Sequence, residues 1–113
     1  MPGTVTKQLT CPVCGVVMGT AVHRRWPPRL VVTSVAGTEV PAESVALQLR
    51  RARSAVAAGG GEAAEQRAAF LERNLMELVF DLRCRNGHST LRTMPQVVRA
   101  MRSHPGQWVD LRG

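Results

Sequence analysis

The chain has 113 residues, 44% of them apolar, and fifteen lysine and arginine residues against eight acidic ones give it a net charge of +7. This length predicts one domain, residues 1–113, with a modest core that a bound metal would help to stabilise. No apolar run approaches the roughly 20 residues of a membrane span, and the N-terminus lacks the basic and apolar stretches of a secretory signal, so a membrane partner is not expected.

The first part of the chain predicts a β-hairpin followed by a third strand. Residues 5–10 alternate loosely and lead into Cys-Pro-Val-Cys-Gly at 11–15, after which a return strand is expected to about Val22. Gly15 follows the second thiol, where a ligand-bearing turn needs a residue that tolerates a positive φ. Residues 30–35 are β-branched and apolar, which predicts the third strand.

An unusual loop, His-Arg-Arg-Trp-Pro-Pro-Arg, precedes this third strand at residues 23–29. Its two prolines disfavour regular structure, and its arginines surround an indole. One interpretation is a hairpin tip whose Trp26 folds back on the sheet. The other is a contact loop in which Arg24, Arg25 and Arg29 engage phosphates while Trp26 stacks on a base or fills a partner's pocket.

The middle of the chain predicts an inserted helical hairpin at about residues 41–76. Pro41 suits the first turn of a helix over 42–57, whose apolar residues recur every three or four positions. The glycines at 59–61 break this helix, and residues 62–76 predict a second one. The glycine run lacks a preceding strand and a Gly-Lys-Ser/Thr ending, so it is not a phosphate-binding loop.

Three arginines of the first predicted helix, Arg50, Arg51 and Arg53, lie mostly off its apolar stripe. They are interpreted either as a solvated helix face or as a patch that faces phosphates. The sequence leaves both interpretations open.

The last part of the chain predicts strands and a short helix. Residues 78–84 alternate with a period of two and form the clearest strand, with Leu78, Phe80, Leu82 and Cys84 on one face. A return strand is expected at 89–92.

Thr-Met-Pro-Gln at 93–96 is a capping box with proline in its first turn, and it predicts a helix over 94–103. His-Pro-Gly at 104–106 ends this helix. Residues 107–111 predict an edge strand docked through Trp108.

Two short motifs far apart in the chain predict a metal site. Cys11 and Cys14 are separated by two residues, and Cys84 and His88 by three, so each pair can reach one ion from a tight turn. Three thiolates and one imidazole suit a tetrahedral Zn²⁺. The alternative is two unrelated cysteine features in a reduced interior. Three cysteines cannot form a closed disulfide set, and as ligands they favour an intracellular, cytoplasmic location.

Catalysis by this metal is not expected. A catalytic zinc keeps an open position for water, whereas four ligands are available here. Neither the His-x-Glu signature of zinc deaminases nor a His-Glu-x-x-His motif occurs in the sequence. His23 and His104 lie beside arginine or proline and are weak substitute ligands. We therefore expect a protein without enzyme activity and without a small-molecule substrate.

At Cys11-Pro-Val-Cys-Gly15 and Cys84-Arg-Asn-Gly-His88 the sequence resembles the zinc-ribbon (rubredoxin-knuckle) superfamily. The resemblance implies that Cys11, Cys14, Cys84 and His88 bind one structural Zn²⁺. The fold class expected is α+β, with a zinc-ribbon β-sheet base, the inserted helical hairpin and a short C-terminal helix. Zinc ribbons occur in transcription factors, RNA polymerase subunits, ribosomal proteins and assembly factors, which implies an intracellular binding module.

Two functions follow from these features. The first is binding of nucleic acid, or of a ribonucleoprotein or transcription complex, through a basic surface. Its candidate contacts are the arginines of the loop, of the first helix and near the second knuckle, together with one indole: Arg24, Arg25, Trp26, Arg29, Arg50, Arg51, Arg53, Arg85, Arg92 and Arg99. The second is a non-enzymatic adaptor or assembly protein that binds a protein partner through its helices, where Leu47 and Val98 are expected to be exposed.

Overall fold

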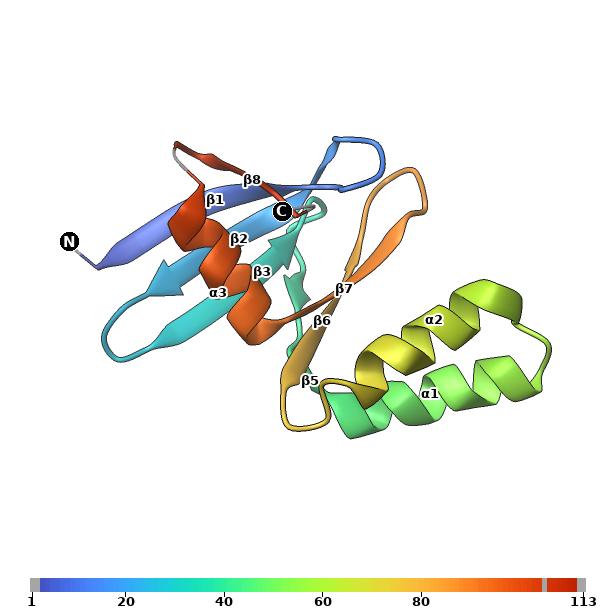
Figure 1. Ribbon diagram of the computed structural model, residues 1–113. Helices are drawn as coiled ribbons and strands as arrows, with labels where there is room; N and C mark the ends of the chain where they lie inside the picture. The colour runs from blue at the N-terminus through green and yellow to red at the C-terminus, as the bar shows by residue number, and fades with distance from the viewer. Residues whose placement is uncertain (1–2, 105, 112–113) are drawn as a thin grey trace.

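The computed structural model describes residues 3–104 and 106–111 of the protein. These residues form eight strands and three helices, in one sheet of five strands and one of three (Figure 1). The expected α+β class is thereby confirmed.

The five-stranded sheet contains the predicted β-hairpin and the predicted third strand. Its spatial order is β4-β3-β2-β1-β8, antiparallel throughout except for β8, which runs parallel to β1. Its strands are β1 (Thr4–Thr10), β2 (Val17–Arg24), β3 (Arg29–Ser34), β4 (Glu39–Val40) and β8 (Trp108–Asp110). Side chains alternate between its two faces, so Lys7 and Leu9 of β1 are buried while Thr6 and Gln8 are exposed.

The three-stranded sheet has the order β5-β6-β7 and is antiparallel. Its strands are β5 (Glu43–Ser44), β6 (Leu78–Arg83) and β7 (Ser89–Thr93). Both faces of β6 carry buried side chains. Phe80 and Leu82 are buried on one face and Val79 is fully buried on the other, while Leu78 is 43% exposed. Val79 is buried because the helical hairpin packs on its face of the strand.

The helical hairpin consists of α1 (Val45–Ala57) and α2 (Gly61–Glu72). The predicted start of the first helix and the predicted end of the second need correction. The first helix begins at Val45 rather than 42, because residues 43–44 pair with β6 and the Ser44 hydroxyl accepts a hydrogen bond from the Leu47 amide at 3.3 Å. The second helix ends at Glu72 rather than 76. Just beyond it, the Asn74 side chain donates to the Phe70 carbonyl at 2.8 Å, a local bond that competes with the helical pattern.

The C-terminal helix, α3 (Met94–Ser103), has the predicted boundaries and the predicted capping box. The Gln96 side chain accepts from the Thr93 amide at 2.9 Å, and the Thr93 hydroxyl accepts from the Gln96 amide at 3.2 Å. At its other end, buried Lys7 donates to the Met101 carbonyl at 2.6 Å and to the His104 carbonyl. This cation lies at the negative end of the helix dipole and ties α3 to β1.

The predicted edge strand β8 is confirmed, but its predicted anchor is wrong. Val109 is fully buried, whereas the Trp108 side chain is 53% exposed. The register explains the difference: Leu9 pairs with Val109 on the buried face of β1, and Gln8 pairs with Trp108 on the opposite face.

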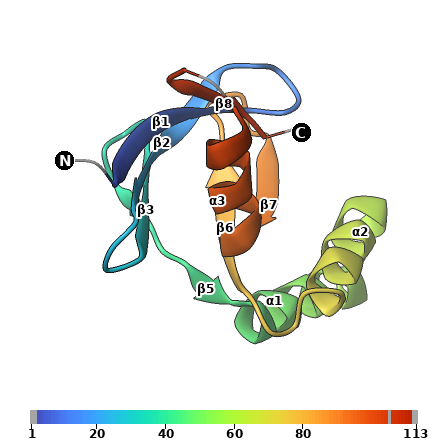
Figure 2. The same cartoon turned by 60° about the vertical axis from the view of Figure 1, so that its left-hand side comes forward.

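Two separate cores hold these elements together. The larger one joins the five-stranded sheet, α3 and one face of β6, and the smaller one joins the helical hairpin to the other face of the three-stranded sheet. The hairpin consequently projects from the rest of the molecule (Figures 1 and 2). The longest dimension of the whole structure, hairpin included, is 48 Å. None of the helices within the described residues is long and apolar enough to cross a membrane.

Candidate metal centre

The first predicted knuckle forms the turn between β1 and β2. The Cys11 amide donates to the Val16 carbonyl at 2.8 Å, and the Gly15 amide donates to the Cys11 carbonyl at 2.9 Å. Gly15 has a φ of 76°, which explains why glycine follows the second thiol. The Val13 amide points at the Cys11 sulfur at 3.4 Å. The turn thus directs both thiols to one side and places an N–H dipole on one of them.

The second knuckle forms the turn between β6 and β7 and repeats this pattern. The Cys84 amide donates to the His88 carbonyl at 3.0 Å, and the Gly87 amide donates to the Cys84 carbonyl at 3.0 Å. Gly87 has a φ of 86° and corresponds to Gly15 of the first turn. Each sheet therefore contributes one hairpin turn with two donor atoms.

These two turns bring Cys11, Cys14, Cys84 and His88 together, with one donor atom from each side chain and all four within 4.8 Å of one another. The Cys14 and Cys84 sulfurs are 3.8 Å apart, and the Cys84 sulfur is 3.3 Å from Nδ1 of His88. Thiolates bound tetrahedrally to Zn²⁺ at about 2.3 Å are about 3.8 Å apart. The three thiols are free cysteines. This cluster could therefore hold a metal ion, with His88 binding through Nδ1.

The surroundings of Cys14 and Cys84 favour charged sulfur. Backbone hydrogen bonding at Val16 and the Asn86 amide, whose nitrogen is 3.4 Å from the Cys14 sulfur, lower the pKa of Cys14 to about 6. Burial raises the pKa of the Cys84 thiol, but hydrogen bonds from the backbone at His88 and Asn86 outweigh it, so that pKa is lowered. A bound metal ion would neutralise thiolates in this arrangement.

The other two donor groups, Cys11 and His88, have raised pKa values. Burial raises the pKa of the Cys11 thiol, and hydrogen bonds to the sulfurs of Cys14 and Cys84 raise the pKa of His88. A metal ion must displace the Cys11 proton, and it competes with any proton on His88. The cluster thus has the chemistry of a cation site at which protons and metal compete.

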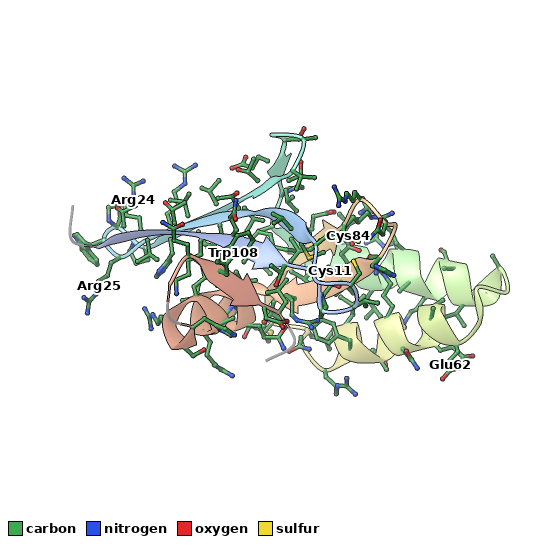
Figure 3. The ribbon with its side chains drawn as sticks, turned by 90° about the horizontal axis from the view of Figure 1, so that it is seen from above. Cys11, Arg24, Arg25, Glu62, Cys84 and Trp108 are labelled. Atoms are coloured by element: carbon green, nitrogen blue, oxygen red, sulfur yellow. The ribbon has the colours of Figure 1, made fainter. Side chains whose placement is uncertain are left out.

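The cluster also lies where it can join the two sheets. Cys11 and Cys84 belong to the larger core, while Cys14 is exposed at the surface. Figure 3 shows Cys11 and Cys84 approaching each other from separate turns in the middle of the molecule. A metal ion bound there would link β1–β2 to β6–β7 at the edge of the core.

The predicted contact loop is shorter than expected and lies at the tip of the β2–β3 hairpin. Arg24 and Arg29 are the last and first residues of the two strands, and Arg25 lies in the turn between them. Trp26 is 84% exposed, so the interpretation in which it folds back on the sheet is wrong. The turn presents its indole and its arginines to solvent.

The arginines of the first helix have a different environment. Arg51 pairs with Glu43 at 3.0 Å and Arg53 pairs with Glu72 at 3.1 Å, while Arg50 has no ion pair among the described residues. The Arg53 pair connects the two helices of the hairpin. Helix α1, which carries all three, lies away from the β2–β3 tip (Figure 1).

The remaining predicted contact residues, Arg85, Arg92 and Arg99, lie in different environments. Arg92 is half-buried and donates to the Leu111 carbonyl at 3.0 Å and to the Leu91 carbonyl at 2.7 Å, so its guanidinium is engaged within the fold. Arg85 is exposed in the second knuckle, and Arg99 is exposed on α3.

Two further candidate contacts, Arg102 and Trp108, were not predicted from the sequence. Arg102, one turn after Arg99 on α3, lines a groove with His23. Burial lowers the pKa of the His23 imidazole, and the charge of Arg102 lowers it further. The i, i+3 spacing of the two arginines was the signal for it. Trp108 is the other, and its alternation with buried Val109 was the signal.

Comparisons with known proteins identify no relative: no family model, no curated protein and no solved structure matches this chain.

Proposed function

We propose that the protein is a zinc-ribbon-type module that binds nucleic acid with one basic end, and that one structural Zn²⁺ at Cys11, Cys14, Cys84 and His88 holds it together. Thiolate and imidazole donors at tetrahedral spacing favour zinc over the harder cations. Four protein donors leave no position for a reactive water, which supports a structural role and a protein without enzyme activity. Thiolate coordination of this kind suits the reducing cytoplasm.

The observation that carries the nucleic-acid proposal is a set of cations at one end of the molecule, here called the basic end. It consists of Arg24, Arg25 and Arg29 at the β2–β3 tip and Arg99 and Arg102 on α3. None of the five pairs with a carboxylate among the residues that the structure describes. Figure 3 shows Arg24 and Arg25 at the opposite end of the long axis from Glu62.

Unpaired arginines beside an exposed indole are suited to a polyanion with aromatic bases. Guanidinium groups bind phosphate oxygens with two hydrogen bonds, and an exposed Trp26 can stack on a base. Glu77 lines the same groove as Arg99 and Arg102 but forms an ion pair with neither. A ribonucleoprotein partner would be bound through the same phosphates.

The test is binding of a fluorescently labelled oligonucleotide across a salt series. We expect the logarithm of affinity to fall linearly with the logarithm of salt, with a slope of about −0.7 for each phosphate contacted on a single strand. Arg24→Glu/Arg25→Glu should weaken binding at low salt by about tenfold or more and flatten the slope.

The matched comparison for one charge reversal is Arg25→Glu against Arg73→Glu. Arg73 is exposed just after α2 and has no ion pair within the described residues, so its reversal changes the net charge equally at another place. Equal losses of affinity in both variants would contradict a localised site, and no binding at low salt would contradict the function itself.

A specific observation also favours a protein partner as the second candidate function. A groove of about 620 Å³ runs between α3, the loop before β6 and the β2–β3 tip, and it is lined by Met94, Val98 and Leu78. Met76 at its rim is 96% exposed, which is unusual for so large an apolar side chain. An adaptor role through α3 predicts a co-purified protein that persists at high salt and is lost in Val98→Asp. Leu47, the other expected apolar contact, is 36% exposed on α1, away from this groove.

A further inference from the structure

The five-stranded sheet has one face covered by α3 and one face without a covering element, here called the outer face. Figure 2 shows α3 on one side of β1–β3 and nothing on the other. The strand register places every second residue on it, from Thr4, Thr6 and Gln8 of β1 to Thr20, Val22 and Arg24 of β2 and Arg29, Val31 and Thr33 of β3. These side chains are exposed or half-buried.

At one end of the outer face two arginines lie directly opposite each other. Arg24 of β2 pairs in register with Arg29 of β3, and both are exposed. Like charges in this position destabilise a sheet, and neither side chain has a carboxylate partner among the described residues. A shallow concavity of about 390 Å³ lies there, lined by both arginines together with Thr4, Val22 and Val31. An anion bound between the guanidinium groups would remove the repulsion and accept hydrogen bonds from both.

Towards the other end of the same face lies the indole of Trp108. It pairs in register with Gln8, four residues along β1 from Thr4, which is the neighbour of Arg24. At about 3.4 Å per residue, the two features are roughly 14 Å apart along the strands. In Figure 3, Trp108 lies nearer the middle of the molecule and Arg24 nearer one end.

The surface between these features carries no charge. Its side chains are Thr6, Gln8, Thr20 and Val22. Of the carboxylates that the register places on this face within the described residues, Glu39 is on edge strand β4 and Asp110 lies two residues beyond Trp108. A cationic site, a neutral path and an aromatic platform therefore follow one another across an open sheet.

We infer that the outer face binds single-stranded nucleic acid, with a phosphodiester between Arg24 and Arg29 and a base stacked on Trp108. This inference rests on the function proposed above and names the class of nucleic acid. A base can stack on Trp108 only when it has left its own stack, as in a single strand. The strands β1–β3 form an open surface without the helix that commonly enters the major groove of a duplex.

The two tryptophans, in a chain without tyrosine, allow each indole to be observed separately. Trp26→Phe leaves Trp108 as the sole indole, and Trp108→Phe leaves Trp26. The probe is a labelled oligothymidylate of about twelve nucleotides, and its anisotropy reports saturation independently. In Trp26→Phe we expect quenching of Trp108 emission with the same midpoint as the anisotropy change.

Affinity provides the second readout. Trp108→Ala should weaken binding of this oligonucleotide by about five- to a hundredfold, as loss of one stacked base does elsewhere, and Trp108→Phe should keep most of the affinity. Val35→Ala, which trims another exposed apolar side chain in the β3–β4 turn, should leave affinity unchanged. A duplex of the same length should bind more weakly and should be insensitive to Trp108→Ala. Thermal melting of each variant shows that the fold is retained.

The outcomes separate this inference from the proposed function. Unchanged Trp108 emission at saturation, or an affinity of Trp108→Ala within twofold of the unmodified protein, overturns the outer face as the binding surface. If Arg24→Glu/Arg25→Glu still weakens binding in that case, the proposed function stands and the contact is elsewhere on the basic end. A duplex that binds more tightly than the single strand overturns the inference in favour of double-stranded nucleic acid.

Discussion

The basic end and the helical hairpin contain similar numbers of arginines but use them differently. In and around the hairpin, Arg51 pairs with Glu43, Arg53 with Glu72, and Arg67 with Asp81 at 2.7 Å. At the basic end, no arginine has such a partner within the described residues. Except for Arg50, the arginines within α1 and α2 connect elements of the fold, while those of the basic end remain available to an external anion.

The two regions also differ in how much apolar packing supports them. The five-stranded sheet and α3 share a core with large, fully buried side chains such as Leu9, Met18 and Phe80. The hairpin has a small core in which Leu71 is its largest fully buried side chain. Polar contacts therefore contribute a larger share of the cohesion in the hairpin. The proposed metal ion would join the two sheets from which both regions extend.

Loss of the metal should have the largest effect, because it removes the link between the sheets. Cys84→Ser removes one thiolate, and structural zinc contributes on the order of 10 kcal/mol in small zinc domains. We expect the purified variant to lack zinc by elemental analysis and to lose its cooperative thermal unfolding by circular dichroism. Ser103→Ala, a surface change on α3, is the control. A folded Cys84→Ser protein with stoichiometric zinc would show that the ligand set is wrong.

Acidification should weaken metal binding, and the slope of affinity against pH should reflect the titration of Cys11, Cys14 and His88. The Cys11 thiol, whose pKa is raised, holds its proton at neutral pH, so the metal displaces at least one proton and affinity falls about tenfold per pH unit. Below pH 6, Cys14 also takes up a proton, since its pKa is about 6, and His88, whose pKa is raised, is protonated as well. The dependence should therefore steepen below that pH. Competition with a chromophoric chelator between pH 8 and pH 5 measures it, and a pH-independent affinity would contradict Cys3His coordination.

A cavity in the small core should loosen the hairpin and spare the rest. Leu71 is fully buried on α2, and Leu→Ala changes at such sites cost about 2–5 kcal/mol. In Leu71→Ala we expect faster amide hydrogen exchange in α1 and α2, with protection of β1–β3 and zinc content unchanged. Loss of protection across the whole chain would show that the hairpin and the sheet unfold as one unit.

The smallest expected effects distinguish the ion pairs of the hairpin. Arg67 and Asp81 are about three-quarters or more buried and connect α2 to β6, whereas Arg53 and Glu72 are both more than half exposed. A double-mutant cycle should give about 1 kcal/mol or more for the first pair and a few tenths for the second. Chemical denaturation measures both couplings. Equal values would indicate that burial does not set the strength of these pairs.

Some features of this protein depend on interactions between neighbours in the sequence, and these could be predicted from it. The donors form two pairs, with two residues between Cys11 and Cys14 and three between Cys84 and His88. This spacing within tight turns indicates that each pair can bind one metal ion. The capping box at 93–96 defines the start of α3 through bonds between residues three apart. Alternation along β1 and β6 predicts strands for the same local reason.

Other features depend on residues distant in the sequence, and only the tertiary structure decided them. Arg53 meets a carboxylate nineteen residues away and Arg92 meets a carbonyl nineteen residues away, so the sequence could not show that these arginines are engaged while Arg24 is not. Likewise, Trp108 is exposed rather than docked because its register with β1 places Val109, and not the indole, on the buried face. Local spacing determined which residues could meet a metal, and long-range pairing determined which charges and aromatic rings are left for a partner.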